Sequence, residues 1–208
     1  MSLVLPYVDH LVYATPDLEE SIRHLEQLFG VRASIGGQHL GRGTRNALIT
    51  IGERAYLEII GPDPDQPAPN APRWFEIDTI DRPRLVTWAA HANDIPALVA
   101  SSPVPLGAAA QGSRLREDGI TLSWQLTNPD VMLGDGVVPF FIDWGMSPHP
   151  SSTAARGPRL VDVRGEHPDA DATRAMLMQL GIPLAVTSAS QPALIATLQT
   201  AAGPAELR

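Results

Sequence analysis

The sequence contains no cysteine, which excludes disulfides, thiolate metal ligands and cysteine nucleophiles. The lack of disulfides is consistent with a reducing compartment, and we expect a cytoplasmic protein. No apolar run approaches the roughly 20 residues that a transmembrane helix needs. The chain also begins without the basic and apolar segments of a secretory signal, so we expect neither membrane insertion nor export.

Positive charge is scarce as well. Lys and Arg total 15 against 23 Asp and Glu, which gives a net charge of −8. An acidic protein repels a phosphate backbone, so nucleic acid is not an expected partner. Hydrophobic residues make up 44% of the 208 residues. This suffices for a core and fits one large domain, or two small modules that share a core.

Proline and glycine, by contrast, are plentiful, with 20 and 17 residues. They cluster in residues 61–72 and 147–152, which we interpret as linkers. The predicted organisation has a first module at 1–61, a Pro-rich linker at 62–82 and a second module at 83–145. A linker at 146–157 and a C-terminal module at 158–208 follow, all within one compact unit.

The first module shows the repeated pattern best. Residues 8–14 form a β-rich run, and Thr15 with Pro16 marks the start of a helix predicted over 16–29. Gly30 ends this helix, and strands follow at 47–51 and 55–60.

The other two modules repeat this order. We predict a strand at 84–90, a short helix capped by Asp94, a strand at 138–143 and a second long helix at 168–180. The fold class is therefore α+β, with βαβββ modules that form a curled mixed β-sheet and helices on the outside. The concave face of such a sheet is a natural pocket for a small molecule.

Several segments resemble a known superfamily. Residues 8–14 (VDHLVYA), 28–31 (LFGV) and 56–61 (YLEIIG) are similar to one module of the vicinal oxygen chelate superfamily. That superfamily includes glyoxalase I, extradiol dioxygenases and the bleomycin- and fosfomycin-resistance proteins. Residues 39–46 (HLGRGTRN) and 163–168 (VRGEHP) resemble more narrowly its glyoxalase-like domain branch. The resemblance spans essentially the whole chain.

The resemblance implies a divalent metal in the cup, held by the first and last strands of paired modules. By position, His10 is the first-strand ligand, Glu58 the last-strand ligand and Asp143 the counterpart of Glu58 in the second module. The ion would be zinc, nickel, iron or manganese and would act as a Lewis acid on an oxygen-rich substrate. Lyase, isomerase or dioxygenase-type chemistry is then expected, with Glu58 and Asp143 as catalytic groups. Thr87 takes the place of a second histidine and is a poor metal ligand.

Two alternatives therefore stay open. The protein is either a metal-assisted enzyme or a metal-free small-molecule binding protein of the bleomycin-resistance type. Thr87 favours the second alternative, because it stands where a metal-binding histidine is expected. From the residues alone, His10 and Glu58 could also simply pair in a dry core. A homodimer is compatible with each of these hypotheses.

Residues 39–46 are polar and glycine-rich and contain two arginines. We predict that His39, Arg45 and Asn46 contact the ligand, with Arg45 gripping a carboxylate or phosphate. An ordinary strand connection with exposed arginines is the alternative. Trp88 is predicted to form part of the pocket wall, although a tryptophan on a strand also suits a core.

Overall fold

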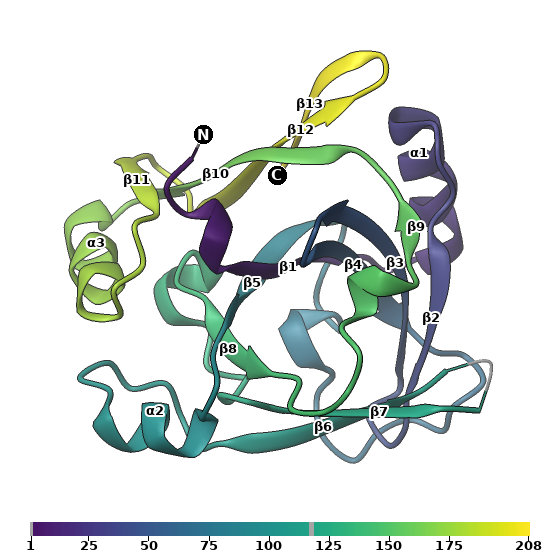
Figure 1. The fold of residues 1–208 in the computed structure, drawn as a ribbon, viewed down its shortest axis with the longest axis horizontal. Helices are drawn as coiled ribbons and strands as arrows, with labels where there is room; N and C mark the ends of the chain where they lie inside the picture. The colour runs from purple at the N-terminus through teal and green to yellow at the C-terminus, as the bar shows by residue number, and fades with distance from the viewer. Residues whose placement is uncertain (1, 117–118) are drawn as a thin grey trace.

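The computed structural model describes residues 2–116 and 119–208 (Figure 1). Most strands belong to one mixed sheet, and β2 pairs with both β3 and β6, so that this sheet closes into a barrel. In order across the sheet, the strands are β2 (Ser34–His39), β6 (Ala110–Leu115), β7 (Thr121–Leu126), β8 (Phe140–Asp143), β5 (Arg84–His91), β1 (Val8–Ala14), β4 (Ala55–Pro62), β3 (Thr44–Gly52) and β9 (Ala155–Arg156). The predicted α+β fold with a curled mixed sheet is confirmed.

The α-helices of the described residues lie outside the barrel (Figure 1). They are α1 (Leu18–Phe29), α2 (Ile95–Ser101) and α3 (Ala170–Gln179), and the described chain also has short 3-10 turns at η1 (Leu5–Tyr7), η2 (Trp74–Glu76), η3 (Leu133–Gly136) and η4 (Pro150–Ser152).

The first helix begins two residues later than predicted. The carboxylate of Asp17 accepts the backbone N–H of Glu20, so Asp17 is the N-cap, while Thr15 accepts the N–H of Asp17. At the other end, Gly30 has a φ of 73°, the left-handed conformation that favours glycine after a helix.

A second, smaller sheet packs against the outside of the barrel. It consists of β11 (Ala185–Ser188), β10 (Arg159–His167), β12 (Ala193–Thr200) and β13 (Gly203–Leu207). Strand β12 contacts β5 and strand β10 contacts β3. The barrel interior is therefore built from the strands that precede residue 157.

Side chains of the barrel strands alternate between two hydrophobic cores. Along β1, Leu11 and Tyr13 face outward and pack with the helices and the second sheet. Val12 and Ala14 face the barrel interior, where aromatic residues from β4, β8 and η2 join them. The interior is not packed solid, and the remaining space is the candidate site.

Candidate functional site

A cavity lies inside the barrel, between the strands and the η2 turn. Its volume is about 430 Å³, including space that is open to solvent. Its walls are apolar, with a few polar side chains that converge, as in most small-molecule sites. The apolar lining is Tyr56, Ile60, Trp74, Phe75, Trp124, Leu126, Phe140, Ile142 and Trp144, and the polar lining is His10, His39, Asn46, Glu58 and Arg114.

His10 is the best-positioned acid–base group of the cavity. Its Nδ1 lies 2.7 Å from Asp9 Oδ1, and because a carboxylate only accepts, Nδ1 donates to it. In the neutral ring, Nε2 then keeps its lone pair, and it lies 3.7 Å from Glu58 Oε2. The ring of Tyr56 stacks on His10 with a centroid distance of 4.7 Å, which fixes the plane of the imidazole.

Glu58 is held by a chain of hydrogen bonds on its other side. Asn46 Nδ2 donates to Glu58 Oε1, and Arg114 Nη1 donates to Asn46 Oδ1 over 3.1 Å. His39 Nε2 lies 3.8 Å from Glu58 Oε1 and its Nδ1 contacts Thr44 Oγ1 at 3.0 Å. The predicted cavity residues His10, His39, Asn46 and Glu58 therefore lie together, and Arg114 joins them.

Burial tunes the charges around Glu58. It lowers the pKa of His39 from 6.5 to about 4, against the opposing effect of Glu58, so His39 is neutral at physiological pH. Burial also lowers the pKa of Arg114, although an arginine remains cationic. Arg114 Nε and Trp74 Nε1 are buried donors without a hydrogen-bond partner among the described residues. Such unpaired donors are costly, and a ligand oxygen would relieve that cost.

Asp9 supports His10 from behind, through a β-bulge. Val8 and His10 of β1 pair with Ala90 and Ala89 of β5, respectively. Asp9, which lies between Val8 and His10, has no pairing partner on β5. A bulge re-aims side chains, and here it brings a fully buried carboxylate beside the His10 ring.

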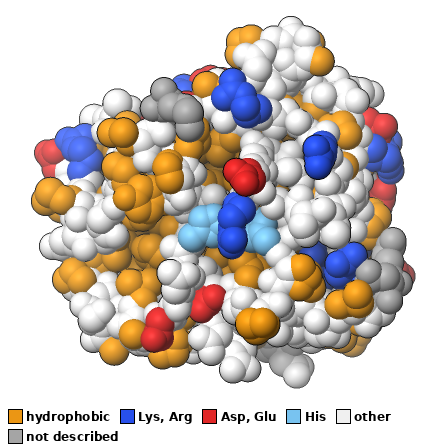
Figure 2. All heavy atoms as spheres, in the orientation of Figure 1, with side chains coloured by type: hydrophobic (Ala, Val, Ile, Leu, Met, Phe, Trp, Pro, Cys, Tyr) orange, Lys and Arg blue, Asp and Glu red, His pale blue; other side chains and the backbone are white. Residues whose placement is uncertain are grey.

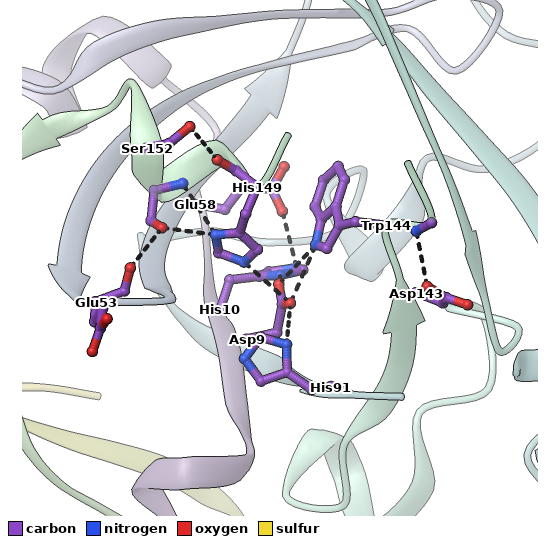
Figure 3. Close-up of polar contacts among 11 residues, drawn as sticks. Asp9, His10, Glu53, Glu58, His91, Asp143, Trp144, His149 and Ser152 are labelled. Atoms are coloured by element: carbon purple, nitrogen blue, oxygen red, sulfur yellow. Dashed lines mark hydrogen bonds and ion pairs between the residues drawn. The ribbon is translucent and has the colours of Figure 1, made fainter. Parts of the chain in front are cut away.

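The Asp9 carboxylate gathers nitrogen atoms from distant parts of the chain (Figure 3). Besides His10, it contacts His91 Nδ1 at 2.7 Å, His149 Nε2 at 3.2 Å and Trp144 Nε1 at 3.2 Å. Burial alone would raise the pKa of Asp9, but the hydrogen bonds from His10, His149 and His91 outweigh it and hold the pKa well below its usual range. Asp9 is therefore an anion that orients His10.

Asp143, in contrast, does not share the cavity with His10 and Glu58. It accepts the backbone N–H of Gly145 at 2.8 Å and lines a separate outer hollow (Figure 3). Its neighbours on β8, Ile142 and Trp144, are the residues that line the cavity. A shift of one residue along a strand moves a side chain to the other face of the sheet. Asp143 therefore points away from the cavity, and the prediction that it joins His10 and Glu58 there is wrong.

The strand pairing identifies the true counterparts in the second module. His10 pairs with Tyr56 across β1 and β4, and Ala89 pairs with Phe140 across β5 and β8. Ala89 is also the direct partner of His10 across β1 and β5, so Ala89 is its counterpart, rather than Thr87. By the same offset, Ile142 is the counterpart of Glu58.

The residues of the cavity therefore do not fit the metal centre that the resemblance implies. The second module contributes alanine and isoleucine where metal ligands would stand. The Asn46 amide lies between Glu58 and His39, and the cationic Arg114 guanidinium donates to that amide, so positive charge is already present beside Glu58. Within residues 2–116 and 119–208, three metal-ligating side chains come together elsewhere, at Asp9, His91 and His149, whose ligand atoms all lie within 4.8 Å of one another.

Two predicted ligand contacts are also placed elsewhere. Arg45 neighbours Asn46 on β3 and therefore points to the opposite face, where its Nη2 lies 3.6 Å from Glu19 Oε1 on α1. Trp88 is fully buried in the outer core, and its Nε1 donates to the Val137 carbonyl over 2.9 Å. Neither side chain lines the cavity.

Several residues of the site carry no clear signal in the amino-acid sequence. Arg114, on β6, replaces Arg45 as the arginine near the cavity polar groups, and nothing local marks it. His91 lies just past the end of a strand and His149 in the predicted linker at 147–152, and neither place indicates a site residue. Asp9 offered the one usable signal, because a carboxylate in an otherwise apolar strand needs buried partners.

The paired modules, the closed curled sheet and the interior cavity define a protein of the vicinal oxygen chelate type. Residues 8–181 match the glyoxalase-like domain family, and the chain belongs to this family. The resemblance seen in the sequence is thereby confirmed. Membership indicates a small-molecule enzyme or binding protein.

Of three similar solved structures, the first supports the fold. A hypothetical protein from Staphylococcus aureus is 16% identical with a TM-score of 0.60, over 83% of this chain and 74% of that chain. A methylmalonyl-CoA epimerase from Mycobacterium tuberculosis is 18% identical with a TM-score of 0.41, over 68% and 88%. A variant methylmalonyl-CoA epimerase from Streptomyces coelicolor, in complex with 2-nitronate-propionyl-CoA, is 16% identical with a TM-score of 0.44, over 65% and 95%.

Among curated proteins, no sequence matches this chain. No helix in the described part of the chain is long and apolar enough to cross a membrane.

Proposed function

We propose that this protein binds a small, anionic, oxygen-rich molecule in the barrel cavity and moves a proton on it, with His10 as the base. The observation that carries this proposal is the Asp9–His10 pair, whose free Nε2 faces Glu58 in an aromatic cavity. An imidazole oriented by a carboxylate is a common general base, since the carboxylate fixes the tautomer and stabilises the imidazolium.

The reaction class follows from the charges around His10. Nε2 would take a proton from a carbon next to a carbonyl group, and the electron pair of the C–H bond would move to the carbonyl oxygen. Arg114 and Asn46 lie where they could stabilise this enolate. Glu58, 3.7 Å from Nε2, would stabilise the imidazolium until the proton returns to carbon. This is isomerase or lyase chemistry by acid and base groups of the chain itself.

An anionic ligand is favoured by the donors that lack partners. Arg114 is the one arginine among the described residues that line the cavity, and its Nε and the Trp74 Nε1 are unpaired. A ligand carboxylate or carbonyl would satisfy them, and the aromatic walls would exclude water and strengthen the interaction.

A metal-free binding protein is the second candidate. The largely apolar lining of the cavity favours it, because the aromatic rings of Trp74 and Phe75 offer contact area rather than reactive groups. A binding protein would bind a ligand between these rings without exchanging any of its protons.

One experiment separates the two candidates. The protein is titrated with small 2-oxo acids and related carboxylates that carry a hydrogen next to the carbonyl, with tryptophan fluorescence as the readout. For each ligand that binds, exchange of that hydrogen in deuterated water is followed by NMR. We expect binding with exchange in the wild type, binding without exchange in His10→Asn, and at least tenfold weaker binding in Arg114→Gln.

Arg45→Gln is the matched control, because Arg45 faces away from the cavity, and its binding should equal that of the wild type. Binding without exchange in the wild-type protein would favour the binding-protein candidate. The acid–base proposal fails if exchange persists in His10→Asn.

A further inference from the structure

We propose that Asp9, His91 and His149 form a binding site for one divalent transition-metal ion, outside the barrel cavity. The three ligands come from β1, from the end of β5 and from the segment just before η4. One ligand atom from each of these residues lies within 4.8 Å of the other two. The site does not depend on the proposed reaction in the cavity, and either proposal can fail alone.

The spacing of these atoms is close to that of a metal centre. Nitrogen and oxygen ligands about 2.1 Å from an ion, at right to tetrahedral angles, lie roughly 2.9–3.4 Å apart. Asp9 Oδ2 lies 2.7 Å from His91 Nδ1 and 3.2 Å from His149 Nε2. The nitrogen atoms of His91 and His149 must come into the same range, and His91, whose side chain is 29% exposed, can move to bring all three ligand atoms around one ion.

The cluster is accessible to ions from solvent. The side chain of His91 is partly exposed, and Figure 2 shows that histidine side chains reach the surface on one face of the molecule. His91 also lines a surface hollow with residues of η1 and of the turn between β3 and β4. The deepest ligand, Asp9, is fully buried and supplies the negative charge.

The ring of His149 is supported for metal binding by a hydroxyl group. His149 Nδ1 lies 2.7 Å from Ser151 Oγ, and Ser151 Oγ can donate to the Glu53 carbonyl over 3.1 Å. The backbone N–H of Ser151 also donates to Nδ1 over 3.3 Å, so without an ion the ring carries its hydrogen on Nε2 and donates it to Asp9. Binding of an ion at Nε2 requires this hydrogen to move to Nδ1, where Ser151 Oγ accepts it while its own hydrogen lies on the Glu53 carbonyl. Metal-binding histidines are usually fixed by such a contact at the second ring nitrogen.

The chemistry of the ligands selects the class of ion. Two imidazoles and one carboxylate, without thiolate, suit zinc, nickel or cobalt with positions left for water, whereas calcium and magnesium prefer oxygen ligands alone. The ion would tie the segment around His149 to β1 and β5. It would use Asp9 Oδ2 and leave Oδ1 to accept the hydrogen bond from His10.

The test is metal binding by the intact protein after chelation and desalting. Zinc and, separately, cobalt are added, and stoichiometry and affinity are measured by calorimetry and by elemental mass spectrometry. We expect one ion per chain and a rise in Tm with zinc in the wild type. His91→Ala and His149→Ala should each weaken binding more than 100-fold and abolish the rise in Tm.

His24→Ala is the matched control, since His24 is an exposed histidine on α1, and it should bind as the wild type does. Circular dichroism verifies that the variants fold. If the alanine variants do not fold, the proposal is tested on the wild type alone. Zinc must then shift the NMR signals of the His91 and His149 rings. Absence of stoichiometric binding, or binding that both alanine variants retain, would overturn the proposal.

Discussion

The buried histidine of the cavity should make the stability of this protein depend on pH. Burial lowers the pKa of His39 from 6.5 to about 4, so the folded protein keeps this ring neutral over a range in which the unfolded chain protonates it. The unfolded state then binds more protons, and stability must fall as the pH falls from about 6.5 to about 4. Above this range, His39 is neutral in both states and contributes no pH dependence.

The size of the effect follows from the two pKa values. A difference of roughly 2.5 pH units, at about 1.4 kcal/mol per unit, gives a total loss of roughly 3–4 kcal/mol. Between about pH 7 and about pH 5, the loss attributable to His39 is about 2 kcal/mol. This is a large part of the 5–15 kcal/mol that is typical of folded domains.

Urea unfolding of the wild type and of His39→Gln, at both pH values, measures this contribution. Glutamine keeps a polar group in contact with Thr44 but cannot titrate. Its loss of stability between the two pH values should therefore be smaller by about 2 kcal/mol, even if its stability at neutral pH is lower. His24→Gln, at an exposed position, should keep the wild-type pH dependence. Equal pH dependence in the wild type and in His39→Gln would refute the argument.

Two further changes test the packing around the cavity. Trp88→Phe removes the hydrogen bond to the buried Val137 carbonyl and should lower the free energy of unfolding in urea by about 2 kcal/mol. Ligand affinity should stay unchanged, and a loss of affinity at full stability would instead place Trp88 in the site. Glu76 has a φ of 57°, a left-handed backbone conformation that is strained for any residue except glycine. Glu76→Gly should therefore stabilise the protein by roughly 0.5–1 kcal/mol, whereas Glu76→Ala keeps the strain and should not. Equal Tm values for the two variants would contradict this.

Much of the first module could be predicted because its signals are local. Alternating apolar residues in 8–14 require a strand with two buried faces, and Gly30 marks the end of the helix before β2. Asp94 caps the second helix as expected. These features depend on residues that are close in sequence, so the local sequence pattern is sufficient to predict them.

The error at Asp143 shows where local pattern stops. The sequence places an acidic residue at the end of a strand, but pairing between β5 and β8 decides which face it takes. With a register difference of one residue, Ile142 instead of Asp143 faces the cavity. The wall then carries an apolar side chain where the sequence predicted a metal ligand. Arg45 was misplaced for the same reason, since Asn46 is the residue of that pair that faces inward.

The amino-acid sequence by itself determined the α+β class, the family and the pair His10 and Glu58, because strand periodicity, helix ends and family motifs are written along the chain. Only the tertiary structure decided the closure of the barrel through β2, the entry of Arg114 into the cavity and the meeting of Asp9 with His91 and His149. The physical reason is distance along the chain. Residues some 140 positions apart meet only after the strands have paired, and a β-bulge has turned Asp9 toward them.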